Sequence, residues 1–498
     1  MASEKELILP LAIIERSKHR TERHGWFLLS LVSIIAFWSF VYCEVLGKTG
    51  FAIRLLLTDK GHTTPIGLPD RIQRRWGQYS PYFPAGKYVG PPKGCKITQV
   101  NILQRHGIRY PNEDDEYDKS VNNLMSAEKF HDSKLEFLKD YEYKLREEFL
   151  TPLGAQESFE SGKEVFHRYN HLITPHLLPF VRASGKSRVV DSAGNWTVGL
   201  AVASKHHIHA SVDQILSESV NNTLNNDCPN ASQGEEEKNT WLSVFAPPIV
   251  KRLQKAAHKA NITNQDVHKL MALCPFESLG LEKRSPFCKI FTKAEFADFE
   301  YFGDVEKYYK TGYGNPLGPI QGVGYVNELL ARLTDKPVHD KTQHNHSLSF
   351  PLDRTIYADF THENSQVAVF AAMGLFDVSE APDPKKMRRM PEVREWVASR
   401  MVPFSGRMVV EKLECVGKSF AEYSDRIGDA VHGGLPTSQL KEKGEYVRIF
   451  VNDALQPLEF CGAKKKGRRR GMCTLDRFLE SQAYARRNGD EDFTKCYN

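Results

Sequence analysis

The stretch Lys96-Ile-Thr-Gln-Val-Asn-Ile-Leu103 is followed, after Gln104, by Arg105-His106-Gly107-Ile108-Arg109-Tyr110-Pro111, and these two runs decide the fold and the place of its chemistry. The first is short, apolar and rich in β-branched residues, as in a buried strand. Similar runs predict further strands at Thr355–Phe360, Val409–Leu413 and Tyr446–Val451. Helical patterns lie between these runs, so we expect an α/β fold with a layered core.

Helix start signals are clearest in the middle of the chain. Thr151-Pro152 combines a good N-cap residue with a proline at the first helical position. Thr263 and Thr292 are further candidate caps, and Gly312 is a candidate stop. The expected helices lie at about 264–273, 293–310, 322–334 and 366–375. Because the region 112–330 is too long for simple crossovers, we expect it to contain a helical lid.

Two arginines flank a histidine at the predicted carboxyl end of the first strand, where open α/β sheets bind ligands. The planar guanidiniums of Arg105 and Arg109 suit bidentate binding of a phosphate. His106 can attack phosphorus, and the carbonyl of Gly107 could fix the tautomer of its imidazole. For any one of these residues, a basic turn with a surface histidine is the alternative. The density of the cluster after a buried strand favours the catalytic interpretation.

The second predicted strand leads into His362-Glu363-Asn364, which opens a helix whose free N–H groups favour an anion. A phosphohistidine mechanism needs a proton for the leaving alkoxide and then a base for water, and Glu363 can serve as both. In the alternative interpretation, Glu363 only caps the helix and His362 is a hydrogen-bonded core histidine.

The net charge of +5 does not indicate a nucleic-acid partner. One run holds six positive charges, more than the whole excess: Lys464, Lys465, Lys466, Arg468, Arg469 and Arg470. A solvated loop is the default interpretation of such a run. Attraction of a polyanionic substrate and cleavage by a basic-site protease are the alternatives.

The segment Trp26–Cys43 is apolar and uncharged. Its length is at the lower end for a membrane-spanning helix and long for the core of a signal peptide. The slight excess of basic residues before it favours a cytosolic N-terminus. We therefore expect a cytosolic tail at 1–25, a transmembrane or signal-anchor segment at 26–43 and a stalk at 44–73. A cleaved signal is the alternative.

Nine cysteines and five Asn-x-Ser/Thr sequons favour an oxidising, secretory compartment. Cys43 ends the apolar segment, and the other eight form an even set without a CxxC pair, which favours disulfides over zinc. No metal or other cofactor is predicted. The body would lie in the secretory lumen or outside the cell, and would be secreted if the anchor is cleaved. The sequons begin at Asn195, Asn221, Asn230, Asn261 and Asn345.

Long segments of the chain resemble the fungal phytases of the histidine acid phosphatase family. RHGIRYP is similar to the RHGxRxP signature of that family, and the similarity extends from about residue 74 to 498. It implies a phosphoglycerate mutase-like layered core with a helical lid. It also implies a phosphomonoesterase that forms a phosphohistidine and prefers phytate, inositol hexakisphosphate. The similar segments are 74–83, 94–111, 150–169, 181–190, 315–334, 352–366 and 447–462.

The resemblance also implies roles for single residues. His106 would be the nucleophile, and the phosphoryl oxygens would be bound by Arg105, Arg109, His362 and Arg188, with Arg182 in support. Lys307 would bind outer phosphates of the substrate, unless it is a solvated helix lysine. The implied disulfides are Cys95–Cys415, Cys228–Cys496, Cys274–Cys288 and Cys461–Cys473.

The chain departs from the family at one site residue. The family usually has His-Asp where this chain has His362-Glu363, and glutamate is one methylene longer. A broad-specificity acid phosphatase is therefore one alternative, and an anchored glycoprotein with reduced turnover is another. The presence of His106 and of the signature arginines counts against the second. A cytosolic relative of phosphoglycerate mutase is disfavoured by the apolar segment, sequons and cysteines.

Overall fold

The computed structural model describes residues 66–220, 222–387, 394–416, 443–461 and 471–498. The chain divides into two units, 1–61 and 62–498, and all described residues lie in the second unit. The expected tail and membrane segment, Cys43, Asn221 and the basic run 464–470 fall outside the described residues. Within the ranges given above, no helix is both long and apolar enough to cross a membrane.

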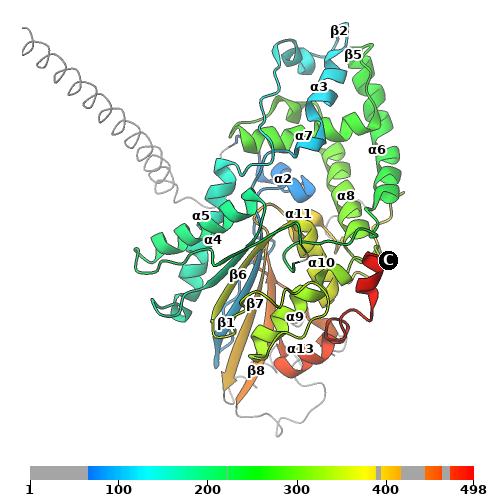
Figure 1. The fold of residues 1–498 in the computed structure, drawn as a ribbon. Coiled ribbons are helices and arrows are strands. Elements are labelled where there is room, and N and C mark those ends of the chain that lie inside the picture. Colours follow the sequence, from blue (N-terminus) through cyan, green and yellow to red (C-terminus); the bar gives the residue numbers. More distant parts are fainter. Residues whose placement is uncertain (1–65, 221, 388–393, 417–442, 462–470) are drawn as a thin grey trace, which may run out of the picture. The chain divides into compact units, whose positions relative to one another are not determined.

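A mixed sheet of eight strands forms the centre of the unit (Figure 1). Its order is β10-β8-β7-β1-β6-β3-β4, with β9 paired to β8. β1 pairs in parallel with β6 and antiparallel with β7, so the parallel and antiparallel halves of the sheet meet at β1. The strands are β1 (Cys95–Arg105), β3 (Phe180–Ser184), β4 (Gln214–Leu216), β6 (Ile356–Thr361), β7 (Arg407–Val416), β8 (Lys443–Val451), β9 (Ala454–Leu455) and β10 (Cys473–Thr474).

Helices cover both faces of this sheet, which confirms the predicted α/β class. On β1, Val100 and Ile102 join the core beneath α4 and α5, whereas Leu103 joins the core beneath α9 and α10. This division follows from the alternation of side chains along a strand. The helices of these two layers are α4 (Pro152–Tyr169), α5 (Ser187–Ala203), α9 (Ile320–Thr334), α10 (Glu363–Met373), α13 (Leu475–Ser481) and α14 (Ala483–Arg486).

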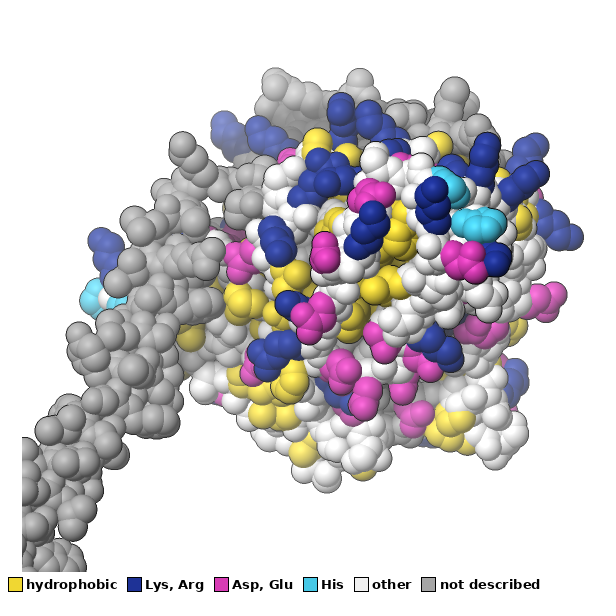
Figure 2. Space-filling model, turned by 90° about the horizontal axis from the view of Figure 1, so that it is seen from above, with side chains coloured by type: hydrophobic (Ala, Val, Ile, Leu, Met, Phe, Trp, Pro, Cys, Tyr) yellow, Lys and Arg dark blue, Asp and Glu magenta, His cyan; other side chains and the backbone are white. Residues whose placement is uncertain are grey.

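A separate helical group with its own core lies beyond one end of the sheet (Figure 1). It includes a small antiparallel sheet of β2 and β5, which are distant in the sequence. On the face seen from above in Figure 2, basic and acidic side chains are interspersed rather than gathered by sign. The members of this group are α3 (Tyr117–Met125), β2 (Lys129–Phe130), α6 (Glu235–Ala256), β5 (Ala257–His258), α7 (Asn264–Gly280) and α8 (Lys293–Lys310). Two short helices, α2 (Asp70–Gln73) and α11 (Ala398–Met401), complete the unit.

The elements of the helical group lie within the stretch 112–330, which was expected to contain a lid, but they do not occupy that stretch continuously. The chain returns to the sheet in the middle of that stretch, because β3 pairs with β6 and β4 pairs with β3. α4 and α5 pack against each other, and α5 packs on β3 and β6. The group therefore consists of two stretches, one on each side of this return.

Three predicted helix starts follow from local capping, whereas α7 (Asn264–Gly280) extends beyond its expected end at 273. The hydroxyl of Thr151 accepts a hydrogen bond from the N–H of Gly154 at the start of α4. Thr263 and Thr292 each form a capping box with an acidic residue three positions later, at the starts of α7 and α8. The sequence predicted all three starts, and α8 also ends at Lys310 as expected.

The ordered body begins earlier than the expected stalk allows. Ile66 and Leu68 are 2% and 7% exposed and belong to the core of the helical group. The side chain of Gln73 donates a hydrogen bond to the carbonyl of Leu68. The last residues of the segment assigned to a stalk at 44–73 are thus packed against the body.

Four disulfides tie the unit together, with the pairings that the family resemblance implied. Cys95–Cys415 joins directly paired positions of β1 and β7. Cys228–Cys496 holds the C-terminal residues, Cys274–Cys288 closes a loop in the helical group, and Cys461–Cys473 precedes α13.

Candidate active site

The carboxyl ends of β1 and β6 bring the two sequence motifs together. Arg105 is paired with Thr361 across these strands, and the N–H of His106 donates to the Thr361 carbonyl at 3.0 Å. The rings of His106 and His362 are consequently 5.5 Å apart between centroids. The site therefore lies at a strand end, as parallel sheets favour.

Gly107 fixes the turn that follows the strand. Its N–H donates to the hydroxyl of Ser192 on α5 at 2.9 Å. A Cβ atom at this position would lie 2.3 Å from the carbonyl oxygen of Gly154, which leaves no room for a side chain. The close approach of the two glycines places the loop against the start of α4 and holds His106 in position.

The imidazole of His106 is oriented for attack through Nε2. Its Nδ1 lies 2.8 Å from the carbonyl oxygen of Gly107. A carbonyl only accepts hydrogen bonds, so Nδ1 carries the proton and Nε2 keeps its lone pair. Burial, and then the positive charge of Arg105, hold the pKa of His106 well below its usual value. The side chain is therefore a neutral base in the structure.

Arg105 is fully buried and rigidly held. Its Nη1 donates to the carbonyl of Val402 at 2.9 Å, and its guanidinium lies 4.4 Å from the ring centre of Phe404. Its Nη2 has no hydrogen-bond partner among the described residues. Burial lowers the pKa of Arg105 to about 10, so the group remains cationic below neutral pH. A buried donor without a partner suits an anionic ligand.

Arg109 and Arg188 complete an arginine cluster with Arg105. The Nε atoms of Arg109 and Arg188 are buried, and no hydrogen-bond acceptor for them lies in the described part of the chain. Burial, and after it the charge of Arg109, lower the pKa of Arg188. Repulsion within this cluster is relieved when an anion binds, so the arrangement favours a phosphoryl group.

His362 is held by a residue that sequence reasoning missed. Its Nε2 lies 2.7 Å from an oxygen of Glu218, which also accepts a hydrogen bond from the hydroxyl of Ser184 at 2.6 Å. Burial raises the pKa of Glu218, but the hydrogen bond and charge of His362, together with hydrogen bonds from Ser184 and the Lys186 N–H, lower it to about 2. Glu218 is 144 residues from His362, and no local pattern marks it.

Glu363 is not merely a helix cap. The N-cap position belongs to His362, and no side chain bonds to the free N–H groups there. One oxygen of Glu363 lies 3.0 Å from the Nε of Arg105 and 3.9 Å from the Nε2 of His106. Burial raises the pKa of Glu363, but the nearby Arg105 and Lys307 dominate and hold it well below its usual value.

Lys307 is not a solvated helix lysine. Its side chain is 2% exposed, and its Nζ lies 2.9 Å from the side-chain oxygen of Asn364 and 3.5 Å from Glu363. The structure therefore places Lys307, on α8, beside Glu363 at the start of α10.

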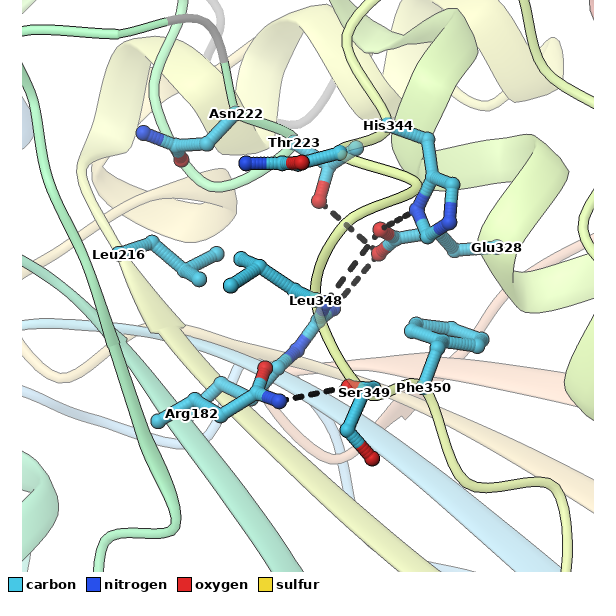
Figure 3. A pocket seen from close by; sticks show the side chains of 11 residues that line it. Arg182, Leu216, Asn222, Thr223, Glu328, His344, Leu348, Ser349 and Phe350 are labelled. Atoms are coloured by element: carbon cyan, nitrogen blue, oxygen red, sulfur yellow. Dashed lines mark hydrogen bonds and ion pairs between the residues drawn. The ribbon is translucent and has the colours of Figure 1, made fainter.

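Arg182 is not part of this cluster, contrary to the expected supporting role. Its guanidinium binds the carboxylate of Asp359 at 2.7 Å. It also binds the carboxylate of Glu328 at 2.6 Å (Figure 3). Those partners lie on β6 and α9. Because they bind all three nitrogens of the Arg182 guanidinium, none of these nitrogens is left for a substrate. The adjoining cavity has a volume of about 10 Å³, which is room for about one water molecule.

Comparisons with known proteins agree with this geometry. A sequence model of the histidine phosphatase superfamily (branch 2) matches residues 96–452. Phytase A of Aspergillus oryzae is 34% identical over 447 residues, covering 84% of this chain and 90% of that protein. Phytase A of Arthroderma benhamiae is 37% identical over 441 residues, covering 84% of this chain and 91% of that protein.

Solved structures show the same fold. The phytase from D. castellii superposes with a TM-score of 0.64 at 22% identity, covering 84% of this chain and 85% of that one. A multiple inositol polyphosphate phosphatase of Bifidobacterium longum, in complex with phosphate, superposes with a TM-score of 0.58 at 13% identity. The superposition covers 82% of this chain and 97% of that one.

Proposed function

The chain belongs to the histidine phosphatase superfamily, branch 2, and is a phosphoric monoester hydrolase, and from this premise we propose that phytate is its favoured substrate and His106 its nucleophile. The observation that carries the proposal is the lone pair on Nε2 of His106 beside an arginine cluster with unpaired buried donors. The relatives named Phytase A support the choice of phytate over a broad range of esters.

In the first half-reaction, Nε2 of His106 attacks phosphorus and the ester P–O bond breaks. Arg105, Arg109, Arg188 and His362 bind the phosphoryl oxygens. Glu363 gives its proton to the leaving alkoxide. In the absence of substrate, Arg105 and Lys307 keep Glu363 ionised. The charge of a bound phosphoryl group offsets those cations, so substrate binding itself favours protonation of Glu363.

In the second half-reaction, water attacks the phosphohistidine and the P–N bond breaks. Glu363, ionised after giving up its proton, accepts a proton from the attacking water. Inorganic phosphate then leaves, and Nε2 of His106 regains its lone pair. This cycle uses Glu363 as acid and then as base, and needs no cofactor.

The test is release of inorganic phosphate from phytate and from p-nitrophenyl phosphate by the full chain at acid pH. We expect a rapid denaturing quench to trap acid-labile phosphate on His106. His106→Ala should lower kcat by roughly 10⁴-fold or more, because the nucleophile is lost. Normal turnover by His106→Ala would refute the mechanism. Equal kcat/KM for phytate and for simple esters would favour a broad-specificity phosphatase.

We also propose that the body meets the secretory lumen or the cell exterior, anchored by residues 26–43 or released from them. Four disulfides support this, because they persist in oxidising compartments. Asn230 and Asn261 are exposed, whereas Asn195 and Asn345 are partly buried. A glycosidase should lower the apparent mass of the expressed protein, and an unchanged mass would count against this compartment.

A further inference from the structure

The carboxylate of Glu148 contacts the arginine cluster but has no role in the proposed reaction. An oxygen of Glu148 lies 3.3 Å from Nη1 of Arg188 and 4.0 Å from Nζ of Lys186. The side chain of Arg188 is 10% exposed, and that of Glu148 is 40% exposed. Glu148 thus places a negative charge beside Arg188 on its solvent side. In the proposed reaction, a phosphoryl group would place its negative charge beside the same guanidinium.

The backbone holds this carboxylate in place. An antiparallel bridge between Arg109 and Leu150 aligns the segment before α4 with the catalytic loop. The N–H of Glu148 donates to the carbonyl of Pro111 at 2.7 Å. Glu148 adopts a left-handed conformation with φ of 57°. That conformation costs a non-glycine residue roughly 1–2 kcal/mol, and such strain tends to be kept where function requires it.

Two anions compete for the same guanidinium. Among the described residues, a partly exposed carboxylate pairs with Arg188 and with no other member of the arginine cluster. Arg105 is paired instead with the partly buried Glu363, on which the proposed chemistry depends. A phosphate that binds Arg188 must displace Glu148 or accept its repulsion at short range. Glu148 therefore opposes the binding of the product phosphate to Arg188, as well as the binding of the substrate's phosphoryl group.

We propose that Glu148 is an internal counter-ion that competes with inorganic phosphate for Arg188 and so weakens product binding. The inference rests on the proposed function, because it assumes that Arg188 binds the phosphoryl group. When inorganic phosphate leaves, the carboxylate of Glu148 pairs with Arg188 in its place. This pairing lowers the free-energy cost of separating phosphate from the arginine cluster. Glu148 then sets the affinity of the site for phosphate and not the rate of bond cleavage.

The test compares two isosteric variants of the full chain by calorimetric titration with inorganic phosphate. Glu148→Gln removes the charge that contacts Arg188, and Glu147→Gln removes the same charge from the exposed neighbouring residue. We expect Glu148→Gln to bind phosphate roughly three- to tenfold more tightly than the wild type, as for loss of a competing, partly exposed ion pair. Glu147→Gln should change the Kd less than twofold. Glu148→Gly, which suits the left-handed backbone, should tighten binding like Glu148→Gln.

The kinetic counterpart is a lower inhibition constant for phosphate and a lower KM, without a rise in kcat. Unchanged or weaker phosphate binding in Glu148→Gln and Glu148→Gly would overturn the proposal, as would equal tightening in Glu147→Gln. A disturbed fold would weaken binding, so tightening cannot arise from damage. The titration needs no turnover. Failure of the wild type to hydrolyse phosphate esters would therefore contradict the proposed function, whereas the role of Glu148 is decided by the phosphate affinities alone.

Discussion

The carboxylate of Glu363 lies beside two cations and beside the ring of His106. With one methylene more than aspartate, its carboxylate reaches both Arg105 and Lys307, with separations of 3.0 and 3.5 Å. The same group lies 3.9 Å from Nε2 of His106, the proposed nucleophile. The carboxylate of Glu363 therefore joins a cation on β1 to a cation on α8.

Glu363→Gln should separate substrates by the basicity of their leaving groups. An alkoxide of phytate needs a proton as it leaves, whereas p-nitrophenolate is a good leaving group without one. We expect kcat for phytate to fall about 10²–10⁴-fold, the usual contribution of one positioned acid, and kcat for p-nitrophenyl phosphate to fall far less. The measurement is kcat for both substrates with wild type and variant. Equal losses on the two substrates would show that Glu363 serves binding and not proton transfer.

The site residues that could be predicted from the sequence are those that stand close together in it. Arg105, His106 and Arg109 stand in one run after a buried strand, so their residue types and spacing suffice. Glu218 and Glu148 stand in stretches that carry no recognisable motif. They become site residues only because the chain folds back beside His362 and Arg188. The misplacement of Arg182 has the same cause, since its role depends on Asp359 and Glu328, which are distant in sequence.

At the scale of elements, α4 and α5 illustrate how backbone contact positions the site. Gly162 on α4 and Gly199 on α5 face the partner helix. A Cβ atom on Gly199 would lie 1.9 Å from the carbonyl oxygen of Phe159, and one on Gly162 would lie 2.0 Å from that of Trp196. The two helices therefore touch backbone to backbone. α4 begins beside Gly107 and α5 carries Arg188, so this contact sets the distance between them.

Gly199→Ala should destabilise the protein, because the added methyl group meets backbone that cannot move aside. We expect a loss of about 2 kcal/mol or more in the free energy of unfolding, as for overpacked cores. Gly194→Ala on the same helix is the matched control, since nothing lies within 4 Å of its Cβ position. The control should gain about 0.5–1 kcal/mol from better helix propensity. Denaturant unfolding of both variants measures the difference, and similar stabilities would contradict the backbone contact.

Capping also explains which elements could be predicted. The starts of α4, α7 and α8 depend on Thr151, Thr263 and Thr292 and on residues within one turn of them. β3 was not predicted, since it has only five residues with a charged Arg182 at its centre. The charge is matched in the fold by carboxylates on the neighbouring strand β6 and on helix α9. The division of the helical region by β3 was hidden for the same reason.

At the scale of the whole molecule, a buried ionic network joins the sheet to its helical layer. Arg182 on β3 and Arg332 on α9 both bind Asp359 on β6, and Arg182 also binds Glu328 on α9. The hydroxyl of Thr223 and the ring of His344 add hydrogen bonds to the Glu328 carboxylate (Figure 3). All four charged side chains are at most 3% exposed. Two cations and two anions balance here, so each carboxylate is needed to stabilise the buried arginines.

The acid stability of the protein should depend on this network. Burial opposes the ionisation of Glu328, but the charge of Arg182 and the hydrogen bond from His344 lower its pKa from 4.5 to about 2. Between these two values the unfolded chain binds a proton that the folded chain does not. The resulting stabilisation is therefore complete above about pH 4.5 and is lost as the pH falls through about 2, with a total of about 3 kcal/mol.

Glu328→Gln tests this directly. At pH 6 the variant should lose about 3–5 kcal/mol in the free energy of unfolding, the usual effect of removing one partner from a buried ion pair. The gap between wild type and variant should narrow as the pH falls from 4.5 toward 2, because only the wild type loses the contribution of the ionised carboxylate. Glu235→Gln, which removes an exposed partner of Lys238, should cost less than about 1 kcal/mol at any pH. Denaturant unfolding across this pH range gives the measurement. A gap that stays constant with pH would show that Glu328 stabilises the fold through packing and neutral hydrogen bonds, and not through its charge.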